Sequence, residues 1–186
     1  RLMGIPTLIK TLTADNDTSL AFVDGTASVV LDGTYDEYIF VCTDIDTAND
    51  SIHPEFQGSI DSGSNYNVAM TTTYFIAGHY EDDSSTIFGY NTGLDQAQGT
   101  ADQQFSYNQG SGADESGSGI IHLFAPASTT YVKHFYSRFI SNGADEIARD
   151  NFCAGYFNTT SAIDAIRFKI DSGNITAGTF QLFGIS

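Results

Sequence analysis

The chain has 186 residues, of which 41% are hydrophobic and 13% aromatic, and its formal net charge is −16. A chain of this length is expected to fold as one domain with a substantial core. Such a negative charge would be repelled by phosphate backbones and anionic lipids, so the charge argues against binding to nucleic acid or a membrane surface. Many Tyr, Phe, Thr, Ser and Gly residues favour strands and turns, and an all-β fold is predicted.

Residues 1–12 are apolar and are predicted to form an N-terminal arm or an edge strand, because Pro6 cannot donate a hydrogen bond to a strand ladder. An apolar terminal segment is suited to docking. The candidate assembly contacts in it are Leu2, Ile5 and Leu8. Residues 13–186 are assigned to a single β-sandwich domain.

Several segments that follow have the patterns of strands and turns. Asp24-Gly25-Thr26 separates two apolar runs and predicts a hairpin. Residues 35–45 are apolar in both alternating phases, which predicts a central strand covered on both faces. Residues 53–60 alternate with Phe56 and Ile60 inward, and residues 68–80 form another long strand.

Residues 91–119 are polar and rich in Gly and Gln, so they are predicted to be an insertion that is either a binding loop or a slack segment. Short helical pieces are expected at 94–98 and 146–149. The closing residues 161–186 contain two rows of alternating apolar residues with turn residues between the rows, which predicts two strands with one buried face each. Ten to twelve short strands in all indicate a sandwich or a barrel.

One acidic loop has the chemistry of a calcium site. Its oxygen-bearing side chains follow an apolar strand and could converge on a hard cation; they are Asp44, Asp46, Asn49 and Asp50. The glycine and the final glutamate of an EF-hand are missing, and a solvated acidic loop is the alternative. No cofactor is otherwise required.

No catalytic motif is found, so the chain is not predicted to be an enzyme. The four histidines are isolated, and no nucleophile elbow or phosphate-binding loop occurs. Cys42 and Cys153 lie in apolar runs and are expected to be buried free thiols, with a disulfide as the alternative. No apolar run approaches the length of about 20 residues that a membrane helix needs.

Loop aromatic residues are candidates for a glycan-binding surface. Tyr66, Tyr90 and Tyr107 lie beside Asn residues, and aromatic rings stack on sugars while amides bind hydroxyl groups. The same residue types are common in turns, which is the alternative interpretation.

Three segments, 7–25, 34–45 and 163–185, carry a resemblance to a known class of proteins. Their sequences, TLIKTLTADNDTSLAFVDG, TYDEYIFVCTDI and IDAIRFKIDSGNITAGTFQLFGI, are similar to the opening and closing strands of small β-sandwich virion structural proteins of tailed, particularly marine, bacteriophages. The resemblance implies a jelly-roll-like antiparallel fold, location in an extracellular virion, and assembly with copies of itself or with other virion proteins. It brings no catalytic residues.

The first functional hypothesis is therefore a non-enzymatic virion protein, either a capsid decoration or a tail- or fibre-associated sandwich. The alternative is a carbohydrate-binding, receptor-binding module that recognises a surface glycan, with calcium as a candidate supporting ion. Eighteen acidic and no basic residues occur between 11 and 130, whereas cations return in the closing third. Arg167 and Lys169 are thus candidate contacts to an acidic neighbouring copy, with intramolecular pairing or simple exposure as the alternatives.

Overall fold

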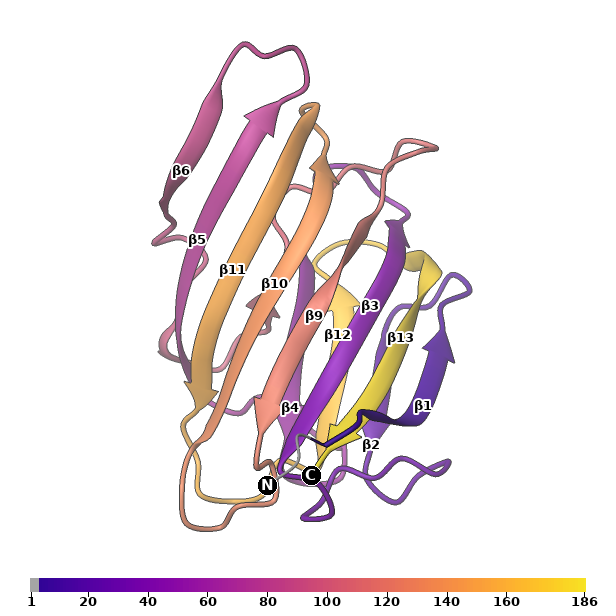
Figure 1. Ribbon diagram of the computed structural model, residues 1–186, viewed down its shortest axis with the longest axis vertical. Coiled ribbons are helices and arrows are strands. Elements are labelled where there is room, and N and C mark those ends of the chain that lie inside the picture. The colour runs from indigo at the N-terminus through magenta and orange to yellow at the C-terminus, as the bar shows by residue number, and fades with distance from the viewer. Residues whose placement is uncertain (1–3) are drawn as a thin grey trace.

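The structure is a computed structural model that describes residues 4–186 as two antiparallel sheets, one packed against the other (Figure 1). Thirteen strands and no helix occur in this range. Each sheet turns an apolar face toward the other, which is how sandwiches build their core. The predicted all-β sandwich in one domain is confirmed, whereas the jelly-roll strand order stays a prediction.

The large sheet lies in front in Figure 1 and the small sheet behind it. In spatial order the large sheet contains β1 (Thr7–Thr13), β13 (Ile175–Ile185), β3 (Glu37–Thr47), β9 (Gly117–Phe124), β10 (Lys133–Gly143), β11 (Ile147–Phe157), β5 (Met70–Tyr80) and β6 (Thr86–Tyr90), with β7 (Ala97–Gly99) also paired to β5. The small sheet contains β2 (Leu20–Val23), β12 (Ala165–Ile170), β4 (Pro54–Ser59) and β8 (Gln103–Gln104).

Phe168 of β12 lies at the centre of the core and is fully buried. The centre of its ring is 5.4 Å from that of Phe40 on β3, 5.1 Å from that of Phe180 on β13 and 6.0 Å from that of Phe105. Phe22 of β2 adds a contact to Phe40 at 5.5 Å. Because these rings come from both sheets, the aromatic cluster joins the two layers.

The two closing strands are confirmed, and they belong to different sheets. β12 is in the small sheet and β13 in the large one, so the turn between them crosses from one layer to the other. Residues of the predicted apolar rows that are buried are Ile163, Ile166, Phe168, Ile170, Phe180 and Leu182. Ile185 is half-buried instead, because it pairs with Glu37 in the alternate phase.

The N-terminal segment becomes an edge strand. β1 pairs with β13, and its register shifts between Leu8 and Lys10, which marks a bulge. Bulges and lysines are common at sheet edges, where they hinder pairing with another chain. Of the two predictions for this segment, an arm or an edge strand, the structure therefore supports the edge strand.

The hairpin predicted at Asp24-Gly25-Thr26 is wrong. β2 pairs only with β12, and the residues after the turn form no strand. The backbone has positive φ at Gly25, Ala27 and Ser28, with values of 72°, 50° and 68°. These left-handed residues turn the chain away from β2, and the following apolar residues are buried as irregular backbone.

Three other local predictions are also wrong. Ile60 is 45% exposed, because β4 ends at Ser59 and the chain turns outward there. Residues 94–98 and 146–149 are turns and strand ends and not helical pieces. In the second case Glu146 has a φ of 57°, which closes a tight turn between β10 and β11.

Residues 91–119 are part of the sandwich and not a slack segment. They contain β7, β8 and the start of β9, and they bury Phe105 and Gln103. The Gln103 side chain accepts a hydrogen bond from the Thr72 hydroxyl at 2.8 Å and donates one to the Leu94 carbonyl at 2.9 Å. Buried amides with both groups bonded hold a segment in place.

Cys42 and Cys153 are both buried and unpaired, as predicted. Burial in apolar surroundings raises the pKa of each thiol. The two thiols therefore pack as small apolar side chains.

Candidate functional site

The outer face of the large sheet, which is turned away from the small sheet, is largely apolar. Two adjacent register rows cross β13, β3, β9, β10, β11 and β5, and we call these twelve residues the central rows. The first row is Phe183, Ile39, His122, Tyr136, Ala154 and Thr73, and the second is Gln181, Val41, Ile120, Arg138, Phe152 and Phe75. A contiguous apolar patch of this kind is typical of a binding surface.

Aromatic rings in the central rows are held in stacked pairs. Tyr136 and His122 have ring centres 4.4 Å apart, and Phe75 and Phe152 have ring centres 4.5 Å apart with nearly parallel planes. Rings that are already packed against each other lose little side-chain entropy when a partner covers them. The rows are therefore suited to act as preformed anchors.

Two shallow hollows lie at the end of this face where β9 ends and β10 begins. One of about 440 Å³ is lined by small residues of β5 and β11 and by aromatic residues that include Tyr136 and Tyr156. The other, of about 570 Å³, is lined mainly by residues between 124 and 134, including Tyr131. Most of the lining atoms in both hollows are apolar, so they suit apolar side chains better than charged groups.

The charged groups of this face are paired within the chain. Arg138 donates hydrogen bonds to both carboxylate oxygens of Asp150, the shortest at 2.6 Å, and its guanidinium lies 5.3 Å from the centre of the Phe152 ring. The Glu37 carboxylate is hydrogen-bonded to His122 Nδ1. The face therefore offers few free charges to a ligand.

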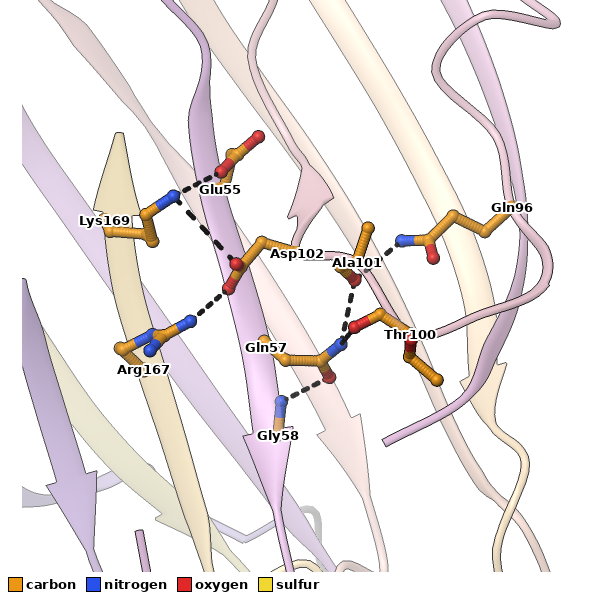
Figure 2. A network of polar contacts seen from close by, with 9 residues as sticks. All are labelled: Glu55, Gln57, Gly58, Gln96, Thr100, Ala101, Asp102, Arg167 and Lys169. Carbon is orange, nitrogen blue, oxygen red and sulfur yellow. Dashed lines mark hydrogen bonds and ion pairs between the residues drawn. The ribbon is translucent and has the colours of Figure 1, made fainter. Parts of the chain in front are cut away.

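A second candidate site lies on the outer side of the small sheet, where four charged residues meet (Figure 2). Lys169 Nζ lies 2.9 Å from a Glu55 oxygen and 3.9 Å from an Asp102 oxygen, and Arg167 donates to Asp102 at 2.8 Å. Desolvation raises the pKa of Glu55, and the hydrogen bond and charge of Lys169 oppose that rise.

The loop that carries Asp102 covers β4. Gln57 donates hydrogen bonds to the carbonyls of Thr100 and Ala101, at 3.2 and 2.8 Å, and Gln96 donates to the Ala101 carbonyl at 3.1 Å (Figure 2). As a result all of β4 is buried, although its outward side chains are polar. The charged cluster therefore fixes residues 100–102 onto the small sheet and leaves no free cation there.

The predicted assembly residues fall in different places. Leu2 lies outside the described residues, and Ile5 is 87% exposed ahead of β1. Leu8 is half-exposed and pairs with Phe183, so it extends the first central row onto the edge strand. Arg167 and Lys169 follow the intramolecular alternative, because both pair with carboxylates of their own chain.

The three candidate sugar-contacting tyrosines do not share a surface. Tyr66 lies under the Arg167 guanidinium at 4.5 Å. Tyr107 stacks on His53 at 4.9 Å, and Tyr90 pairs with Phe75 at the far edge of the large sheet. Binding of a glycan by these three together is not supported by their positions.

Three of the four candidate calcium ligands are engaged in separate side-chain hydrogen bonds. Asp46 accepts from the Thr176 hydroxyl at 2.7 Å, and Asp50 accepts from the Ser111 amide at 3.3 Å. Asn49 donates to the Ser172 carbonyl at 3.1 Å, and Asp44 is exposed. Among residues 4–186, no group of three or more His, Cys, Asp or Glu side chains is arranged to hold a metal ion.

This geometry favours the solvated acidic loop, so we expect EDTA and added Ca²⁺ to leave the melting temperature unchanged within about 1 °C. The Asp44→Ala, Asp46→Ala double variant serves as the control. If Ca²⁺ raised the melting temperature of the natural chain but not of the variant, the loop would be a calcium site. Differential scanning calorimetry in buffer treated to remove metals makes the measurement.

The central rows were not identified as a site from the sequence. A signal was present in β3, where Ile39 and Val41 are apolar in the phase opposite to Phe40 and Cys42. That pattern predicted a strand covered on both faces, yet only the inner face is covered by this chain. Because the strands of the rows are far apart in the sequence, their alignment required the structure.

No described segment forms a helix long and apolar enough to cross a membrane. Comparison of the chain with protein-family models, curated proteins and solved structures found no match. The resemblance to phage virion proteins therefore stays a prediction.

Proposed function

We propose that the chain is a non-enzymatic structural protein that assembles with other proteins through the outer face of its large sheet. The observation that carries the proposal is the pair of central rows, in which Arg138 is the one residue with a permanent charge. Apolar area of this extent gains free energy when a partner removes it from water, at about 25 cal/mol per Å² before the costs of association.

The setting that we propose is a tailed-phage particle outside the cell, on the capsid or near a tail or fibre. The support for this setting is the resemblance of the opening and closing strands to virion sandwich proteins, together with the sandwich fold. Partners in that setting are copies of the chain and other virion proteins. An acidic surface elsewhere would disfavour unspecific contact with nucleic acid.

The alternative function is binding of a surface glycan. The hollow beside Tyr136 and Tyr156 has aromatic walls that could stack on a sugar ring. However, sugar hydroxyls need several hydrogen-bonding groups, and the lining is mainly apolar. Protein assembly is therefore the better-supported function.

Two experiments together test the proposal. Phage particles from a lysate in which the chain is produced are separated on a density gradient and labelled with an antibody against the chain, and we expect the chain to travel with the particles. The same purified chain is applied to a glycan array, where we expect no binding. A chain that stays free of particles and binds a defined glycan would contradict the structural role and support the alternative.

A further inference from the structure

We infer that the outer face of the large sheet binds the same face of a second copy of this chain, so that two large sheets pack face to face about a two-fold axis. This inference rests on the proposed function, since it names the first partner in the assembly.

The area of the face is sufficient for a stable dimer. Six strands cross the central rows, with a spacing of about 4.8 Å and a rise of about 3.3 Å per residue. The two central rows take in about four residues of each strand and cover roughly 400 Å². With one further row on each side, the face takes in eight residues of each strand and covers roughly 800 Å². A stable protein interface of standard size buries about 800 Å² on each partner, so no further surface is required.

The charge distribution favours a second copy over a charged partner. Two copies of a chain with a net charge of −16 repel each other through most of their surface. The central rows contain no carboxylate, and Arg138 is their one permanent charge. The rows on either side contain Asp150, which is paired with Arg138, and Glu37, which is hydrogen-bonded to His122. Two copies can thus approach through this face with little repulsion, whereas a basic partner would be drawn to the acidic loops instead.

The sequence of β3 supports the same occupant. Its two phases are both apolar, as in strands that are covered on both faces. Packing a second sheet over Ile39 and Val41, at the usual separation of about 10 Å, would give this strand the second layer that its pattern requires. Since the covering surface in a two-fold dimer is the same apolar face, the match of polarity is automatic.

A matched pair of variants tests the inference. Ile140 on β10 is 54% exposed beside the central rows, and Ile60, at the end of β4 in the small sheet, is 45% exposed. Each is replaced by lysine, as Ile140→Lys and Ile60→Lys. The two substitutions change the net charge equally, so a difference between the variants reports the position of the residue and not the overall charge.

Sedimentation velocity is measured on the whole chain from about 1 to about 100 µM, a range that covers dissociation constants typical of moderate dimers. We expect the natural chain and Ile60→Lys to form dimers with equal dissociation constants, and Ile140→Lys to weaken the dimer at least about tenfold. Thermal unfolding of each variant shows that the fold is retained.

A natural chain that stays monomeric over this range overturns the inference, and so does an equal dissociation constant for Ile140→Lys and Ile60→Lys. These outcomes are distinct from failure of the proposed function. A monomer that still travels with particles excludes the second copy as partner and leaves the structural role intact. A dimer that never enters particles supports the second copy as partner and contradicts the structural role in a particle.

Discussion

Replacing Phe168 with alanine is expected to lower the free energy of unfolding by about 3–5 kcal/mol. The ring is fully buried and contacts aromatic residues of both sheets, with ring centres 5.1 Å from Phe180 and 5.4 Å from Phe40. Removing it takes away apolar area and also leaves a cavity, because packed rings on two different sheets cannot close together to fill the space. Urea denaturation followed by circular dichroism measures the change.

Phe88→Ala provides the control for this substitution. Phe88 is 83% exposed on the edge strand β6, so its removal leaves no cavity and should change the free energy of unfolding by less than about 0.5 kcal/mol. If Phe168→Ala lowered the free energy of unfolding as little as Phe88→Ala, Phe168 would not hold the two sheets together.

Much of the fold could be predicted from the alternation of apolar residues. The two strands within 161–186 were identified in this way, because one side of each is buried in the core and selects apolar side chains at every second position. The strand at 35–45 was identified from apolar residues in both phases. The pairing of strands could not be predicted. β12 and β13 are consecutive yet belong to different sheets, which is a consequence of packing over the whole domain.

The local errors have physical causes as well. Asp24-Gly25 has the composition of a two-residue hairpin, but left-handed backbone at Ala27 and Ser28 prevents the second strand. Residues 91–119 are polar in sequence, yet they pack against the domain through hydrogen bonds of buried amides. The Gln103 side chain donates to backbone carbonyls within this segment, and the Gln57 side chain on β4 donates to the Ala101 carbonyl. Polarity alone does not distinguish such a packed segment from a slack one.

The sequence likewise indicated some residues of the candidate sites but not their partners. Arg167 and Lys169 were noted from their spacing, and an intramolecular partner was one alternative, but Glu55 and Asp102 could not be assigned as those partners from the sequence. Glu55 meets Lys169 because the two residues are opposite each other where β4 pairs with β12, and Asp102 joins them when residues 100–102 fold over β4. The central rows required even more, since six strands must align before the apolar side chains form one face.

Replacing Lys169 with methionine is the substitution with the second largest expected effect, a loss of about 2–3 kcal/mol in the free energy of unfolding near neutral pH. Lys169 Nζ lies 2.9 Å from Glu55, whose side chain is only 11% exposed. Methionine has similar length and packs similarly but carries no charge, so the Glu55 carboxylate would remain nearly buried without its cation. The partial exposure of Lys169 places the loss below that of a fully buried ion pair.

The pH dependence of this loss identifies Glu55 as its cause. Burial already raises the pKa of Glu55, and removing Lys169 removes the hydrogen bond and the charge that oppose the rise. A carboxyl group whose pKa is higher in the folded state than in the unfolded state favours the folded state at low pH, and that contribution is lost as the pH rises through the folded pKa. The deficit of Lys169→Met should therefore be smaller at pH 5 than at pH 7.5.

The matched control is the double variant Lys169→Met, Glu55→Gln, in which the nearly buried group is neutral at every pH. We expect it to recover most of the stability lost at pH 7.5 and to remove the additional pH dependence, as urea denaturation at both pH values would show. The recovery should be incomplete, because Lys169 also lies 3.9 Å from Asp102, which then relies on Arg167 alone. If the single variant lost the same free energy at both pH values, loss of packing by the lysine stem would be the cause, and the ion pair with Glu55 would contribute little.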